Sequence, residues 1–418
     1  MGRGRRDAEP APEIGSDDKL SAMSMSRVSG TFLVGFLAAA LVGASDKPRA
    51  RDLGVPFDGV PGPGNAITDV GGVAVGHSTI IRGEGALKVG VGPVRTGVTA
   101  ILPRGKATSN DPVFAGWFAL NGAGEMTGTT WVEESGFLEG PVMITNTHSV
   151  GAVHAGTIAW RIQQGGPDAT GYWWSNPVVA ETWDGELNDI NGFHVKEANV
   201  FEALSTARTG PVAEGSVGGG TGMVCNGFKG GIGTSSRRLP EEAGGYTVGA
   251  LVQCNYGRKA DLLVAGVPVG REIAGSGTRD DDAGSIIIVV ATDAPLLPHQ
   301  LKRIARRASL GLARDGSTAG NGSGDIFIAF STANPGAAKP MGTITLTDVP
   351  NDRMNPLFAA TVQSVEEAII NAMVAAETMK GANNVTVRAL PHDELRRILK
   401  KYKRLVETSP SLARDPRP

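Results

Sequence analysis

Glycine punctuates this chain between short apolar runs, and that pattern limits the folds it can adopt. The 418 residues include 59 glycines, about twice average usage, and they show no Gly-X-Y period. Short runs of β-branched and apolar residues bounded by glycine are typical of buried strands joined by tight turns. Five such runs lie at residues 72–76, 97–102, 140–144, 245–252 and 285–290. The sequence therefore predicts a compact, strand-rich protein.

Longer segments carry a helical period. Residues 296–314 have five basic residues among regularly spaced apolar ones, which predicts an amphipathic helix with Asp293 in the N-cap position. Further helices are expected at 149–164, at 364–380 with Gly381 as its stop, and at 393–406. Helices and strands are mixed along the chain, which indicates the α/β class.

Charge and residue types exclude several classes of function. The 40 basic and 42 acidic side chains give a formal charge of −2, so there is no electrostatic footprint for nucleic acid. The six histidines form no His-Glu-x-x-His motif and no Cys/His cluster, so we expect neither a metal nor another cofactor. Cys225 and Cys254 both lie in apolar runs, and we expect two buried thiols, although an oxidising compartment permits a bridge.

The first 44 residues resemble a secretory signal. Arg27 precedes an apolar run at 31–44 that ends in small residues and is too short to span a membrane comfortably. Met23 or Met25 would be the natural start of such a signal. We expect an exported protein, in a periplasm, with no stable membrane insertion after signal removal. Residues 45–408 then form a single domain, and 409–418 a disordered tail.

One serine stands before a strand-like apolar run in a glycine-rich segment. Ser323 lies between Gly322 and Gly324, and the buried run 326–330 follows. A serine hydroxyl needs a base beside it, and a cut between Gly322 and Ser323 would supply one, the new α-amine of Ser323 itself. The flanking glycines permit the strained backbone that an N-to-O acyl shift requires. A simple Gly-Ser hairpin turn is the competing interpretation.

Six motifs follow one another along the chain: Asn146–Gly151, Pro177–Gly185, Gly218–Met223, Val252–Gly257, Ala291–Leu297 and Gly320–Asp325. Together they resemble the family of the L-aminopeptidase/D-amidase-esterase and the β-peptidyl aminopeptidases, over about residues 52–385. The family's members are self-cleaving N-terminal-nucleophile serine hydrolases with an αββα four-layer sandwich. The resemblance implies a homo-oligomer, a tetramer by this analogy, and a domain cut into 45–322 and 323–408 with Ser323 as nucleophile.

Four further residues take roles from this resemblance. Ser364 and Glu366 match a Ser-x-Glu element that orients the nucleophile, although Ser364 with Glu367 also fits a helix capping box. Asn255 matches the donor to the oxyanion, where the alternative is an asparagine supporting a turn. Glu181 matches the carboxylate that holds the substrate's ammonium group.

Trp183 occupies a position where relatives often carry a tyrosine that supports the oxyanion. An indole N–H can donate a hydrogen bond but cannot accept one, so the departure changes the geometry of the expected site. His148 we expect to be buried with its hydrogen bonds satisfied, outside the catalytic group.

The sequence thus predicts an exported, self-cleaving serine aminopeptidase that acts on short peptides, amides or esters with a free N-terminus. An acyltransferase of the ornithine acetyltransferase type is a second hypothesis, but that type uses threonine as its new N-terminus. A non-catalytic exported binding protein is the third.

Overall fold

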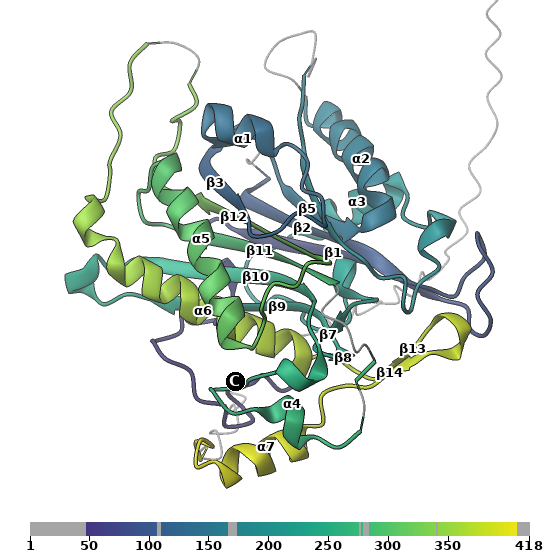
Figure 1. The fold of residues 1–418 in the computed structure, drawn as a ribbon. Helices are drawn as coiled ribbons and strands as arrows, with labels where there is room; N and C mark the ends of the chain where they lie inside the picture. The colour runs from purple at the N-terminus through teal and green to yellow at the C-terminus, as the bar shows by residue number, and fades with distance from the viewer. Residues whose placement is uncertain are drawn as a thin grey trace, which may run out of the picture. The chain divides into compact units, whose positions relative to one another are not determined.

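Two β-sheets form the centre of the molecule, shown in Figure 1. The computed structural model describes residues 47–106, 110–165, 174–275, 277–278, 284–339 and 342–407, so the expected signal region and the tail at 409–418 lie outside the described residues. The first sheet has the order β1-β2-β5-β6: Ala74–Arg82, Val94–Lys106, Val142–Asn146 and Val178–Thr182. The second has the order β4-β3-β12-β11-β10-β9: Phe137–Leu138, Val113–Ala119, Ser323–Ser331, Gly284–Thr292, Thr247–Asn255 and Gly231–Arg238.

Helices cover the outer face of each sheet. Helices α2 (Val150–Gln163) and α3 (Glu197–Ser205) lie over the first sheet, and α5 (Pro298–Arg314) and α6 (Asn355–Val374) over the second (Figure 1). An apolar cluster that includes Ile144 and Ile287 fills the space between the two sheets. The αββα four-layer sandwich expected from the family resemblance is confirmed.

Strand alternation explains why one strand can serve two apolar layers. In β10, Val248, Ala250 and Val252 belong to the cluster beneath α5 and α6, whereas Leu251 belongs to the cluster between the sheets. Successive side chains of a strand point to opposite faces, so a continuous apolar run is what a doubly covered strand requires. This is why the glycine-bounded runs of the sequence lack polar alternation.

The connection before Ser323 differs from the prediction. Strands β11 and β12 pair in parallel, with Gly284 opposite Ser323, and α5 forms the crossover between them. Parallel neighbours cannot be joined by a tight hairpin, because the chain must return to the same end of the sheet. The Gly-Ser hairpin interpretation is therefore wrong, and Ser323 is the first residue of an interior strand.

Two expected helix starts are also wrong. Helix α6 begins at Asn355, with a proline in its first turn, and ends at Val374, so Ser364 lies in mid-helix and forms no capping box with Glu367. The Glu367 carboxylate instead accepts hydrogen bonds from Arg51, Arg237 and Asn65. Its pKa is lowered, because the contacts with the two arginines outweigh the opposing effect of desolvation.

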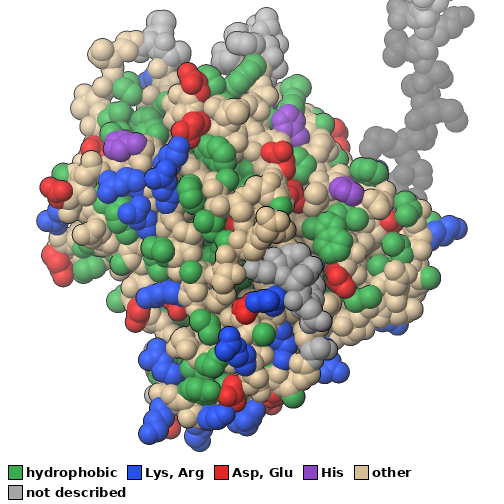
Figure 2. All heavy atoms as spheres, viewed as in Figure 1, with side chains coloured by type: hydrophobic (Ala, Val, Ile, Leu, Met, Phe, Trp, Pro, Cys, Tyr) green, Lys and Arg blue, Asp and Glu red, His purple; other side chains and the backbone are tan. Residues whose placement is uncertain are grey.

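Asp293 does not cap α5. Its Oδ1 accepts a hydrogen bond of 2.7 Å from the Thr247 backbone N–H, and the N-cap residue of α5 is Leu297. The expected helix at 149–164 is confirmed as α2, and the last one is α7 (His392–Lys401), shorter than expected. Basic side chains gather at the lower end of the view in Figure 2, where α7 lies, and Leu395, Ile398 and Leu399 form its buried face.

Short elements complete the described chain. They are α1 (Thr129–Ser135), α4 (Val269–Glu272) and the strand pairs β7–β8 (Val224–Cys225, Phe228–Lys229) and β13–β14 (Met379–Lys380, Thr386–Val387). Cys225 at the end of β7 forms a disulfide with Cys254 of β10, which corrects the expectation of two free thiols. Among the described residues, α6 alone is long and apolar enough to cross a membrane, and it is a core helix, 78% buried.

Gly233 tests the contact between α6 and the second sheet. A Cβ at this position of β9 would lie 2.0 Å from the Ala368 carbonyl oxygen of α6. We expect Gly233→Ala to reduce the free energy of unfolding by about 1–3 kcal/mol, because the helix must move away from the sheet. Chemical denaturation measures the change.

Gly71→Ala is the matched control, because Gly71 has open space around its Cα and needs no left-handed backbone. Its effect should stay within about 0.5 kcal/mol. Equal stabilities of the two variants would contradict the close approach of α6 to β9.

Candidate functional site

The strand register brings three predicted or newly found polar residues to one end of the second sheet. Asn255, the last residue of β10, lies opposite Ser285 of β11, and Ser323 begins β12 beside Gly284. Paired residues of adjacent strands lie about 5 Å apart, so these backbones are immediate neighbours. The site therefore forms where one strand ends and the next two begin.

Ser285 is a serine that the sequence analysis did not select. It is 3% exposed, and its Oγ donates a hydrogen bond of 2.6 Å to the carbonyl oxygen of Gly284, the residue before it. Gly284 has φ +137°, and a Cβ there would lie 2.1 Å from the Asn255 carbonyl oxygen, so no larger residue fits. The signal was present: a Gly-Ser step precedes a buried apolar run at Gly284-Ser285 as well as at Gly322-Ser323.

Ser323 has a carboxylate partner. Its Oγ donates to Oδ1 of Asp325 at 2.6 Å, and both residues lie on the same face of β12 because they are two positions apart. Asn121 fixes the Asp325 carboxylate with a hydrogen bond of 3.1 Å from its Nδ2. Ser323-Gly324-Asp325 thus repeats the Ser-x-acid spacing that the sequence analysis had recognised only at Ser364-Val365-Glu366.

Ser364 and Glu366 are not brought to Ser323. The Ser364 Oγ donates to the carbonyl oxygens of Ala360 and Val248, and Val248 lies level with Thr292 and hence with Ser331. Ser331 is the far end of β12, about 26 Å from Ser323 at the usual rise of a strand. The structure therefore contradicts an orienting role for Ser364 at Ser323.

Glu366 lies in the outer helical layer. Its Oε2 accepts a hydrogen bond of 2.6 Å from Arg314 at the end of α5. It lines a surface pocket of about 490 Å³ together with Phe57 and Arg404. This turn of α6 faces the surface pocket and not the strand ends that carry Ser323. The Ser-x-Glu spacing alone was therefore misleading.

Glu181 approaches the site from the other sheet. It is the penultimate residue of β6 and 2% exposed, and its carboxylate accepts hydrogen bonds from the Glu125 N–H at 3.0 Å and from the Thr147 hydroxyl. A Cβ on Gly124 would lie 3.3 Å from Glu181 Oε1 and 3.0 Å from the Gly324 Cα, so only Gly124 separates the carboxylate from β12. Burial raises the pKa of Glu181, against the opposing effect of its hydrogen bonds.

The Asn255 amide is held from two sides. Its Oδ1 accepts a hydrogen bond of 2.8 Å from the Val224 N–H, and its Nδ2 donates one of 2.8 Å to the Trp183 carbonyl oxygen. The backbone carbonyl of Trp183 therefore contacts Asn255, while the indole ring packs over Gly185; the residue as a whole is 40% exposed. The interpretation of Asn255 as a mere turn residue does not explain this fixed amide.

His148 is exposed, so the expectation of a buried histidine is wrong. Its ring stacks on Phe193 with centroids 6.2 Å apart. Its charge also lowers the pKa of Glu181, as the smallest of the effects on that carboxyl group. Among the described residues, no group of three or more His, Cys, Asp or Glu is arranged to hold a metal ion.

Comparison with known proteins gives a consistent result. The sequence profile of Peptidase family S58 matches residues 65–387. The beta-peptidyl aminopeptidase BapA of Sphingosinicella microcystinivorans is 56% identical over 389 residues, which are 89% of this chain and 97% of that protein. A second BapA, of Sphingosinicella xenopeptidilytica, is 51% identical and covers 84% of this chain and 91% of its own.

Solved structures share the fold. The L-aminopeptidase D-Ala-esterase/amidase of Ochrobactrum anthropi, described as a prototype serine aminopeptidase with a variant of the Ntn-hydrolase fold, aligns with a TM-score of 0.80 at 50% identity. It covers 86% of this chain and 100% of its own. The beta-aminopeptidase of a Burkholderia species aligns with a TM-score of 0.78 at 48% identity, over 87% of this chain and 100% of its own.

The two Ser-x-acid elements can be compared directly. Glu366→Gln should change kcat by less than about threefold, because Glu366 contacts Arg314 on the outer helices and not the residues around Ser323. Asp325→Asn is the matched variant, and it should lower kcat by at least about tenfold, because the carboxylate partner of the Ser323 hydroxyl is lost. Steady-state hydrolysis of an aminoacyl p-nitroanilide measures both. The reverse order of effects would restore the role inferred from sequence for Glu366.

Proposed function

Because the chain belongs to peptidase family S58 and is a hydrolase of the N-terminal-nucleophile type, we propose that it cuts its own chain and then acts as a serine aminopeptidase. Its substrates are short peptides, amides and esters, from which it releases the N-terminal residue. None of the comparisons favours the acyltransferase hypothesis. Self-cleavage also distinguishes this proposal from a non-catalytic binding protein.

Ser285 is the nucleophile that the geometry supports best. The single observation that carries this assignment is the register, which places Ser285 directly opposite Asn255, the candidate oxyanion donor. The Ser285 hydroxyl also contacts the carbonyl of the very peptide bond that would be cut, Gly284–Ser285. Ser323 is paired with Gly284 on the next strand and donates its hydroxyl to Asp325, so this pair would hold the new amine.

The reaction needs two acyl transfers. In maturation, Oγ of Ser285 attacks the Gly284 carbonyl carbon, the C–N bond breaks, and the nitrogen takes the hydroxyl proton to become the free α-amine. Water then hydrolyses the ester, which leaves the Gly284 carboxylate and restores the hydroxyl. With substrate, the amine accepts the Oγ proton and passes it to the leaving amine, and water hydrolyses the acyl-enzyme. An N–H of Asn255 stabilises the oxyanion in each step.

Cleavage between Gly322 and Ser323 remains the alternative from the sequence. It would place the new terminus beside Asp325, which supports it, because a carboxylate at 2.6 Å can accept the Ser323 proton. It would also leave Ser285 within the larger fragment. The two cuts give different N-terminal sequences.

N-terminal sequencing of the matured protein decides between the two serines. We expect the new terminus to read Ser-Ile-Ile-Ile-Val, from Ser285. Ser285→Ala should remain a single chain without activity. Its matched control, Ser323→Ala, should still be cut before Ser285, with slower turnover.

A terminus reading Ser-Gly-Asp-Ile-Phe, from Ser323, would overturn the Ser285 assignment and support the alternative. A wild-type chain that stays uncut after export, with no peptidase activity, would favour the binding protein.

Glu181 is the proposed site for the substrate's ammonium group. It is a buried carboxylate that only Gly124 separates from β12, beside the reacting strand ends, and its hydrogen-bond donors are neutral. The protonated amino group of a substrate would supply a positive charge to pair with the Glu181 carboxylate. This pairing would explain why the enzyme requires a substrate with a free N-terminus. The two curated relatives at 56% and 51% identity are named for β-peptides, so we include N-terminal β-residues among the substrates.

The pH dependence of KM tests this role. Only the ionised carboxylate attracts the ammonium group, so KM should increase as the pH falls through the raised pKa of Glu181, earlier than for an ordinary glutamate. Glu181→Gln should increase KM by about 10–100-fold at neutral pH and remove this pH dependence.

Glu125→Gln is the matched control. The Glu125 charge raises the pKa of Glu181, so removing it should shift the increase in KM to lower pH while KM at neutral pH changes little. If KM of Glu181→Gln matched that of the wild type, Glu181 would not bind the ammonium group.

Export and assembly are further parts of the proposal. The apolar run at 31–44 supports a signal sequence, and the Cys225–Cys254 disulfide fits an oxidising compartment such as a periplasm. Exposed apolar side chains on the connection between β1 and β2, at Leu87, Val89 and Val91, support a homo-oligomer, for which we propose a tetramer.

A further inference from the structure

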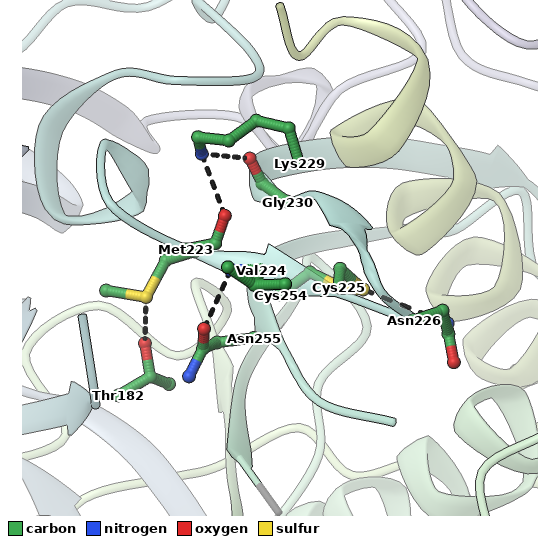
Figure 3. Close-up of a disulfide and its surroundings, with 9 residues drawn as sticks. All are labelled: Thr182, Met223, Val224, Cys225, Asn226, Lys229, Gly230, Cys254 and Asn255. Carbon is green, nitrogen blue, oxygen red and sulfur yellow. Dashed lines mark hydrogen bonds between the residues drawn. A yellow bond between two sulfur atoms is a disulfide. The ribbon is translucent and has the colours of Figure 1, made fainter. Parts of the chain in front are cut away.

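Lys229 is a buried cation that lies one peptide group away from the candidate oxyanion donor. Lys229 is the last residue of β8 and is 0% exposed. Figure 3 shows its Nζ directed at the backbone, with hydrogen bonds of 2.8 Å to the carbonyl oxygens of Met223 and Gly230. A third carbonyl, of Gly220, lies at 3.4 Å. Within the described part of the chain, no carboxylate forms a hydrogen bond or ion pair with Lys229.

A lysine in this position is costly to the fold. Burial lowers its pKa to about 7, because desolvation penalises the charged form. A buried ion pair would compensate the charge, but neutral carbonyls do so only in part. An apolar side chain could fill the space without that cost, so the hydrogen bonds to the carbonyls are what the lysine adds.

The Met223 carbonyl is rigidly linked to the donor that Asn255 uses. The Met223 C=O and the Val224 N–H belong to one planar trans peptide group, in which the two point in opposite directions. Lys229 donates a hydrogen bond to the Met223 carbonyl oxygen of this peptide group. The Val224 N–H of the same group donates to Asn255 Oδ1 at 2.8 Å (Figure 3). Rotation of this peptide would break both contacts together.

The peptide group, together with the Trp183 carbonyl, sets which way the Asn255 amide points. An asparagine amide can turn over, and only its hydrogen bonds distinguish the oxygen from the NH₂ group. The Val224 N–H requires the oxygen on its side, which leaves Nδ2 to donate toward Trp183. The disulfide holds the same two segments together from the other side, because Cys225 follows Val224 and Cys254 precedes Asn255.

We propose that Lys229 is a positioning residue for acyl transfer, which fixes the Met223–Val224 peptide and thereby keeps the Asn255 amide in its donor orientation. The inference rests on the proposed function, in which Asn255 stabilises the oxyanion. The competing explanation is that Lys229 only supports the turn between β7 and β8.

A double-mutant cycle on the matured enzyme separates these explanations. We expect Lys229→Met to lower kcat by about 10–100-fold, with KM within about threefold, because the donor is misplaced but the substrate site is intact. Asn255→Ala should lower kcat by about 10²–10³-fold. The double variant should match Asn255→Ala alone, since Lys229 has nothing left to position. Circular dichroism and thermal unfolding confirm that each variant is folded.

Lys259→Met is the matched control for losing a buried lysine. Lys259 is 9% exposed, and among the described residues its Nζ hydrogen-bonds to the backbone carbonyls of Ile273 and Gly275 and not to the Met223–Val224 peptide. Lys259→Met should change kcat by the same factor in the wild-type background and in the Asn255→Ala background. If Lys229→Met does not fold, Lys229→Arg keeps the cation and displaces its donors, and the same comparison applies.

Two outcomes overturn the proposal in different ways. If Lys229→Met lowers kcat by the same factor with and without Asn255, Lys229 is structural, while the role of Asn255 stands. If Asn255→Ala leaves kcat unchanged, the oxyanion assignment fails, and the inference about Lys229 fails with it.

Discussion

The hydrogen-bond register of β10, β11 and β12 is the constraint on which the whole site depends. It sets Asn255 against Ser285 and Gly284 against Ser323 at one end of the second sheet, where Asp325 is hydrogen-bonded to Ser323. A shift of one residue would turn each of these side chains to the opposite face. The register is secure because both faces of these strands are buried, one under α5 and α6 and the other against the first sheet.

Much of this architecture was predictable from the sequence, for reasons that particular segments show. The runs at 245–252 and 285–290 are apolar at every position, as strands covered on both faces must be, and the 3.6-residue period of 296–314 identified α5. Helix boundaries were less certain, because Pro356 in the first turn of α6 was a better start signal than the Ser-x-x-Glu pattern eight residues later.

The chemistry of the site was harder to predict because its sequence signals occur more than once. Gly-Ser steps stand at the start of both β11 and β12, and Ser-x-acid elements occur at Ser364 as well as at Ser323. Local sequence cannot choose between such copies, because the choice depends on which strand ends lie beside Asn255, and pairing between distant segments decides that. Asn255 and Glu181 were assigned from the family resemblance, and the structure places both at strand ends. Lys229 gave no sequence signal, because its proposed role depends on a peptide group brought to it by folding.

The Glu367 carboxylate joins segments that maturation would separate. Arg51 and Arg237 precede both proposed cuts and Glu367 follows them, and the Arg237–Glu367 pair is fully buried. The two fragments thus share one core, and neither holds the whole of the second sheet. For the intact precursor, folding is a reaction within one molecule, but a matured copy that loses its structure becomes two separate polypeptides, whose reunion depends on how often they meet. Such an enzyme gains its activity by giving up the ability to renature in dilute solution, so its working lifetime is set by how slowly it opens.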